Sequence, residues 1–130
     1  MKEIEISVSN YERALKKLSE GIAMADNDLN RDGVIQRFEF TFELFWKTIR
    51  LILIHEGFEC RIPRSCIKEA FKHGYIVDDE IFLDILEDRN RSSHVYDEQT
   101  SIEIFERIEQ QYLNALTAAE QRFNEYVKSE

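Results

Sequence analysis

The chain is poor in the residues that interrupt helices, with one proline and four glycines among 130 residues. This scarcity argues against a turn-rich all-β fold and favours long helices. The same counts exclude collagen-like sequences, and two cysteines are too few for a disulfide framework. Intrinsic disorder is disfavoured as well, because 43% of the residues are hydrophobic and 12% are aromatic.

Long apolar runs are also missing. No run exceeds four residues, as in Leu51–Ile54, whereas about 20 are needed to span a bilayer. The N-terminal residues alternate charged with apolar side chains, which does not fit a signal peptide. We therefore expect a soluble cytoplasmic protein in which Cys60 and Cys66 are reduced thiols.

Metal-ligand spacings of the usual kinds are absent too. His55, Cys60, Cys66 and His73 are too widely spaced for the Cys-x2–4-Cys and His-x3–5-His pairs of zinc sites. The sequence therefore predicts no metal site and no cofactor of the chain's own.

Positive charge is in short supply: 17 Lys and Arg face 26 Asp and Glu, for a formal net charge of −9. Proteins that bind nucleic acid by bulk electrostatics are usually basic, so composition alone disfavours non-specific binding. A local cluster of Arg89 and Arg91, joined by Arg61 and Arg64, would still form a basic cleft on an acidic body. The acidic remainder favours a basic protein partner.

What the chain does contain is helical periodicity. Apolar residues recur at gaps of three and four, which marks one buried face per helix. Start and stop signals include a Pro in a first turn and Thr100-x-x-Glu103 as a capping box. The predicted helices cover Val8–Leu29, Ile35–Ile52, Pro63–Gly74, Asp78–Arg91 and Thr100–Tyr126, with a polar break over 26–33. We predict a single all-α domain over residues 1–130, an up-and-down four-helix bundle with one extra short helix.

The second helix is apolar on more than one side. Phe38, Phe42, Phe45 and Trp46 have the spacing of core or dimer-surface residues rather than of a base-stacking row. Its wide apolar face predicts a subunit interface, hence a homodimer. Glu39 and Glu43, one turn apart, could form a catalytic carboxylate pair, but more often such residues lie on a solvated face or partner a cation such as Lys47.

The segment from Arg89 to Tyr96 holds most of the chemistry. A guanidinium suits phosphate oxygens, and His94 can move protons near neutral pH. An Arg and a His on one phosphodiester suffice for metal-free RNA cleavage by the 2′-hydroxyl. A two-fold dimer would supply the second histidine needed for both acid and base. The alternative is a helix end with surface charges and a solvated His.

Several stretches carry a family resemblance that covers nearly the whole chain. They are the run Asp32–Lys47, the helix Pro63–Phe71, and the Arg-x4-His-x-Tyr spacing of Arg89, His94 and Tyr96. The chain resembles the nucleotidyltransferase substrate-binding-protein family, part of the HEPN superfamily of helical bundles that includes the HepT-type toxins.

The resemblance implies a toxin–antitoxin pair. Arg89 and His94 would be the ribonuclease motif at a homodimer cleft, with Asn90 beside them and Arg91 contacting the substrate. A minimal nucleotidyltransferase encoded nearby would neutralise the toxin by AMP transfer (AMPylation) from ATP, with magnesium, to Tyr96. The alternative implied by the same family is a non-catalytic subunit that binds substrate for that nucleotidyltransferase.

Overall fold

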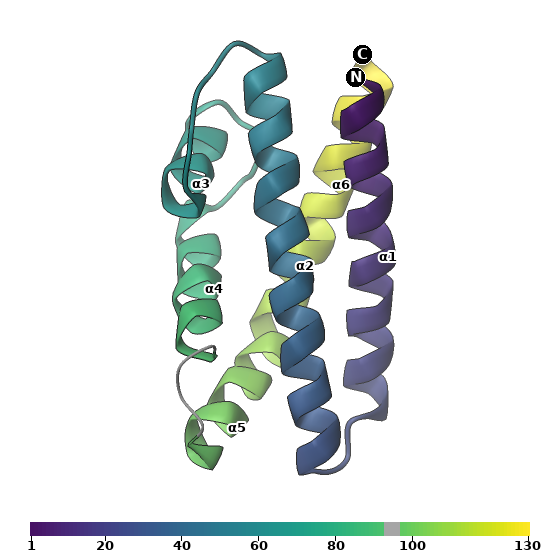
Figure 1. The fold of residues 1–130 in the computed structure, drawn as a ribbon, viewed down its shortest axis with the longest axis vertical. Coiled ribbons are helices and arrows are strands. Elements are labelled where there is room, and N and C mark those ends of the chain that lie inside the picture. The colour runs from purple at the N-terminus through teal and green to yellow at the C-terminus, as the bar shows by residue number, and fades with distance from the viewer. Residues whose placement is uncertain (93–96) are drawn as a thin grey trace.

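The computed structural model describes residues 1–92 and 97–130, and the regular structure in these residues is helical throughout (Figure 1). Its elements are α1 (Lys2–Met24), α2 (Asp28–His55), α3 (Pro63–Lys72), α4 (Asp79–Ser92), α5 (Glu98–Arg107), the π-helical segment η1 (Ile108–Tyr112) and α6 (Leu113–Ser129). The predicted all-α bundle with one extra short helix is confirmed. No helix within these residues is both long and apolar enough to cross a membrane.

The two longest helices, α1 and α2, run antiparallel and pack along their length (Figure 1). α6 returns beside α1, so both chain ends lie at the same end of the bundle. α3 and α4 follow one another along the other side of α2, and α5 crosses below the last turn of α4. α2 therefore contacts helices on two sides, as its wide apolar face predicted.

The core is built around the aromatic residues of α2. Phe45 is fully buried, and its ring stacks on Phe82 of α4 with 4.3 Å between centroids. It also lies 6.2 Å from the ring of Tyr11 and 5.9 Å from that of Phe123. One side chain thus joins α1, α2, α4 and α6. Of the aromatic row predicted for the core or a dimer surface, Phe38, Phe42 and Phe45 lie in the core, and Trp46 is half-buried and packs against it.

The break between the first two helices is shorter than predicted. α1 ends at Met24, and α2 begins at Asp28 because the side chain of Asn27 accepts a hydrogen bond from the Asn30 amide at 2.9 Å. The predicted turn over 26–33 is therefore wrong for residues 28–33, which are helical. Gly33 is tolerated there because one glycine inside a helix lowers stability by only about 1 kcal/mol relative to alanine. Leu29, assigned to the first apolar stripe, is 80% exposed.

The start predicted for the last helix is also wrong. The helix begins at Glu98, and Asp97 caps it by accepting from the amide and hydroxyl of Thr100 at 3.2 and 2.8 Å. An aspartate one turn earlier satisfies the free amides that a Thr100 cap would have served. The ends near Gly57 and Gly74 agree with the sequence, because both glycines adopt the left-handed φ of a helix stop, 91° and 81°.

The cysteines are joined by a disulfide, which corrects the expectation of reduced thiols. Cys60 and Cys66 are six residues apart, with a Cα–Cα distance of 5.1 Å, well inside the range that a disulfide can bridge. The chain turns back at Gly57 after α2, and this brings Cys60 against the start of α3. Their spacing in the sequence did not reveal this approach.

Tyr11 gives the core a testable response to alkaline pH. Its hydroxyl donates to the Leu116 carbonyl oxygen at 2.6 Å, and burial, followed by the charge of Glu120, raises the tyrosine's pKa well above 10.0. Below pH 10 both folded and unfolded chains keep the phenol proton. Above it the unfolded chain loses the proton first, so the free energy of unfolding falls with rising pH by about 1.4 kcal/mol per unit.

We expect Tyr11→Phe to flatten this alkaline loss by about that slope while lowering stability at neutral pH by about 1 kcal/mol through the lost hydrogen bond. Urea unfolding from about pH 8 to 11 measures both effects. An unchanged alkaline slope in the variant would contradict this account of Tyr11.

Candidate functional site

The last turn of α4 carries three of the predicted site residues. Its basic side chains suit the negative end of the helix dipole. Residues two apart on a helix point about 200° from each other, so Arg89 and Arg91 diverge. Arg89 reaches toward α2, while Arg91 pairs with Glu87 at 3.3 Å and with Asp88 at 3.2 Å.

A carboxylate on α2 holds Arg89. The Arg89 Nη2 atom lies 3.1 Å from Glu43 Oε2, and each side chain is about one-third exposed. Glu43 also accepts from the Trp46 indole at 3.2 Å and pairs with Lys47 at 3.4 Å. The partnership of Glu43 with Lys47 is confirmed. The long-range pairing with Arg89 could not be seen in the sequence.

A second carboxylate on α2 contacts the end of α4. The Ser92 hydroxyl donates to Glu39 Oε2 at 2.7 Å and to the Arg89 carbonyl oxygen at 2.9 Å. We call Glu39, Glu43, Arg89 and Ser92 the α2–α4 site. Its guanidinium is paired with the Glu43 carboxylate, so a phosphate that binds Arg89 must compete with Glu43 for it.

The structure brings together some of the predicted residues and separates others. Arg89 Nη1 donates to Asn90 Oδ1 at 3.3 Å, so these two are neighbours. Arg61 and Arg64 belong to the entry into α3, whereas Arg89 lies at the end of α4 farthest from α3 (Figure 1). The described residues therefore do not join them into one basic cleft. His94 and Tyr96 lie outside the described residues.

Asp88 is a buried acidic residue that was not among the predicted site residues. It is 3% exposed and accepts from Arg107 at 2.7 and 3.0 Å and from the Tyr112 hydroxyl. Burial, and then the bond to Asp88, raises the pKa of Tyr112. A signal was present: Asp88 follows the buried Ile85 by three residues, which puts an acid on the apolar stripe of α4.

This network fixes the last turn of α4 against the α5–η1 boundary. Arg107 ends α5, and Tyr112 ends the π-helical segment, where its ring stacks on Phe38 of α2 with 5.8 Å between centroids. Since Asp88 directly precedes Arg89, the buried carboxylate sets where the Arg89 backbone sits. Asp88 is thus a positioning residue for the α2–α4 site.

Comparison with known proteins identifies the family. A family model described as "nucleotidyltransferase substrate binding protein like" matches residues 6–125, and the chain belongs to this family. A crystal structure from Thermus thermophilus is similar, with 33% identity, coverage of 87% of this chain and 98% of that one, and a TM-score of 0.81. A search of curated protein sequences gives no match.

A second solved structure shares the fold at lower identity. HI0074 from Haemophilus influenzae is 20% identical, covers 95% of this chain and 98% of its own, and has a TM-score of 0.68. It is described as revealing the fold of a substrate binding domain of a nucleotidyltransferase.

The Asp88 network predicts a steep stability difference between neighbouring acids. Asp88→Asn removes the charge that neutralises Arg107 and Arg91, and we expect it to lower the free energy of unfolding by about 3 kcal/mol. Glu87→Gln is the matched control, because Glu87 is largely exposed and an exposed ion pair of this kind contributes at most about 0.5 kcal/mol. Urea unfolding monitored by circular dichroism measures both, and equal losses would contradict the structural role of Asp88.

Proposed function

We propose that the chain, acting as one domain over residues 1–130, is a HepT-like toxin of the HEPN type, a cytoplasmic ribonuclease controlled by a minimal nucleotidyltransferase. The observation that carries the proposal is the placement of Arg89: Glu43 orients a partly exposed guanidinium at the end of α4, a few residues before His94 and Tyr96. Membership of the nucleotidyltransferase substrate-binding family supports the choice of partner.

The proposed reaction needs no metal. The 2′-hydroxyl oxygen of RNA attacks the adjacent phosphorus, and the bond from phosphorus to the 5′-oxygen breaks. His94 takes the 2′-hydroxyl proton, while an imidazole of the second protomer protonates the leaving 5′-oxygen. Arg89 stabilises the charge that grows on the phosphoryl oxygens. The products are a 2′,3′-cyclic phosphate and a 5′-hydroxyl, so protons balance.

The two-histidine requirement makes a homodimer part of this proposal. An exposed aromatic residue supports it: Phe40 is 61% exposed and lies three residues before Glu43, hence beside the α2–α4 site on the helix surface. Burying this ring against a second copy would also bring the ends of two α4 helices toward each other.

Regulation would act through Tyr96. Its phenol oxygen attacks the α-phosphorus of ATP in the partner's magnesium site, pyrophosphate leaves, and the phenol proton passes to a base. The attached AMP places a negative charge two residues from His94, where it repels an RNA phosphate and competes with Glu43 for Arg89.

The alternative function is a non-catalytic substrate-binding subunit of a two-component nucleotidyltransferase. A specific observation favours it: Glu43 pairs with Arg89, and Glu39 accepts a hydrogen bond from Ser92 in the same turn of α4, so an RNA phosphate that approaches this helix end meets carboxylates as well as a guanidinium. The net charge of −9 adds to this repulsion. The description of HI0074 as a substrate binding domain of a nucleotidyltransferase agrees with such a role.

The first experiment tests RNA cleavage. The purified, unmodified chain is incubated with single-stranded RNA and tRNA in the presence of EDTA, and products are analysed for 2′,3′-cyclic phosphate ends. We expect Arg89→Ala and His94→Ala to reduce cleavage by at least about 100-fold, as for loss of an acid–base or charge-stabilising group. Arg13→Ala is the control, because Arg13 bonds to Ser9 and Asn10 on its own helix, α1. RNA left intact by the wild-type chain would contradict the ribonuclease and favour the substrate-binding alternative.

The second experiment tests Tyr96 as the acceptor. After incubation with the partner nucleotidyltransferase, ATP and magnesium, intact-mass measurement should show a gain of AMP units that is absent in Tyr96→Phe. Tyr75→Phe should keep the gain, since Tyr75 follows α3 and precedes the start of α4, whereas Tyr96 follows its end. A gain that survives in Tyr96→Phe refutes this acceptor, whereas altered partner turnover without any gain supports the substrate-binding subunit.

A further inference from the structure

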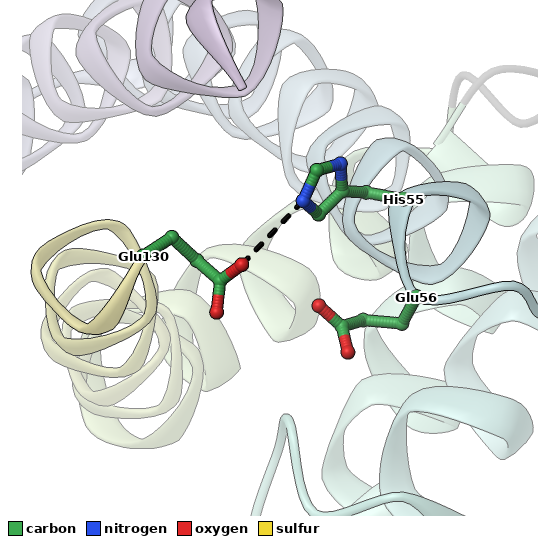
Figure 2. Close-up of side chains that lie close together, drawn as sticks. All are labelled: His55, Glu56 and Glu130. Carbon is green, nitrogen blue, oxygen red and sulfur yellow. Dashed lines mark ion pairs between the residues drawn. The ribbon is translucent and has the colours of Figure 1, made fainter.

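The C-terminal ends of α2 and α6 meet at the end of the bundle that holds both chain ends (Figure 1). His55 is the last residue of α2, Glu56 is its C-cap, and Glu130 is the C-cap of α6. Figure 2 shows that the three side chains point toward one another from these two helix ends. One potential ligand atom from each lies within 4.8 Å of the others, and His55 Nε2 is 3.5 Å from Glu130 Oε1.

Aromatic residues contact His55 and Glu56. The Tyr126 hydroxyl donates to Glu56 Oε2 at 2.6 Å, and the His55 ring lies perpendicular to the Tyr126 ring, with 6.4 Å between centroids. The Tyr75 ring packs edge-on against the Tyr126 ring, with 5.8 Å between centroids. A hydrogen-bonded carboxylate and a packed imidazole are the outer-shell arrangement that orients metal ligands in proteins.

The local charge also favours a cation. Two carboxylates face one imidazole, and the negative ends of two helix dipoles converge on them. A divalent ion would compensate the charge of the two carboxylates.

We propose that His55, Glu56 and Glu130 bind a divalent transition-metal ion with the preferences of zinc. The ligands would be His55 Nε2 and one oxygen from each carboxylate, with water completing a four-coordinate site. Zinc bonds are about 2.0–2.2 Å long, so the three donors must move closer together. All three residues are exposed, which leaves their side chains room to do so. An imidazole donor selects zinc or a similar ion over magnesium, which prefers oxygen ligands and retained water.

The metal would tie the end of α6 to the end of α2. It would not serve the proposed cleavage reaction, because the last turn of α4 lies away from these helix ends along the bundle (Figure 1). The failure of either proposal therefore leaves the other intact.

A second imidazole–carboxylate pair provides a matched control. His73 Nε2 lies 3.2 Å from Glu69 Oε2 on α3, with the His73 ring stacked on Phe58 at 3.7 Å. This pair resembles that of His55 and Glu130 but contributes one carboxylate instead of two. It tests whether a lone His–Glu pair accounts for any zinc that binds.

The experiment titrates zinc chloride into the full chain, without a histidine tag, by calorimetry. We expect one zinc ion per chain, at least tenfold weaker binding in His55→Gln and in Glu130→Gln, and unchanged binding in His73→Gln and Glu69→Gln. Magnesium at the same concentration should give no binding. Circular dichroism of each variant confirms that it remains folded, so a lost site is not a lost fold.

Thermal unfolding supplies an independent readout. Zinc should raise the Tm of the wild-type chain and of His73→Gln, because a ligand that binds only the folded state stabilises it. It should leave the Tm of Glu130→Gln unchanged. Absence of zinc binding by the wild-type chain overturns the proposal, as does binding that survives in His55→Gln or that is lost equally in His73→Gln.

Discussion

The buried carboxylate of Asp88 is the constraint on which the arrangement around α4 depends. A charge that is 3% exposed must be fully partnered, and its partners come from α4 itself, from the end of α5 and from the π-helical segment. These elements can pack in few other ways without leaving the carboxylate unpaired. The network thereby specifies the position of the helix end as well as contributing to stability.

α2 serves the core and the candidate site with different faces. Its phenylalanines fill the centre of the bundle, while Glu39 and Glu43, on the outer side, contact Ser92 and Arg89. The result is a guanidinium whose charge is balanced within the chain. An anion that binds Arg89 has to displace the Glu43 carboxylate, and under the proposed function the cost of this displacement would limit how strongly RNA or an attached nucleotide is held. Such a limit would let an acidic protein act on RNA transiently, as the proposed function requires, without binding it generally.

Much of the fold could be predicted from the sequence because helical periodicity is local. The apolar stripes located all the principal helices, and Pro63, Gly57 and Gly74 marked ends that the structure has. The predicted helix ends were wrong where two local signals competed. Asn27 caps α2 inside the stretch expected to be a break, and Asp97 caps the last helix one turn before the expected capping box at Thr100.

The candidate site was predictable only in part, because its contacts join residues far apart in the sequence. Arg89 and Asn90 were identified from residue type, whereas the Arg89–Glu43 pair spans 46 positions. The disulfide between Cys60 and Cys66 depends on the path of the loop between α2 and α3. Spacing rules for His and Cys ligands could not suggest Glu130 as a neighbour of His55. Only the packing of α6 beside α2 brings those two together.

The π-helical segment 108–112 decides how the last helix tolerates changes in length. Its backbone hydrogen bonds join residues that are five apart in the sequence, instead of four as in an α-helix. Its turn is therefore wider and holds an additional residue. Ile108, Tyr112 and Leu116, spaced by consecutive gaps of four, are all buried. Removing one residue from the segment would restore an ordinary helix and leave the rest of α6 facing nearly the same way, whereas an ordinary helix that kept every residue would rotate the rest of α6 by about 100°. A homologous chain that is one residue shorter at this turn should therefore keep the same buried face on its last helix by forming an ordinary α-helical turn here.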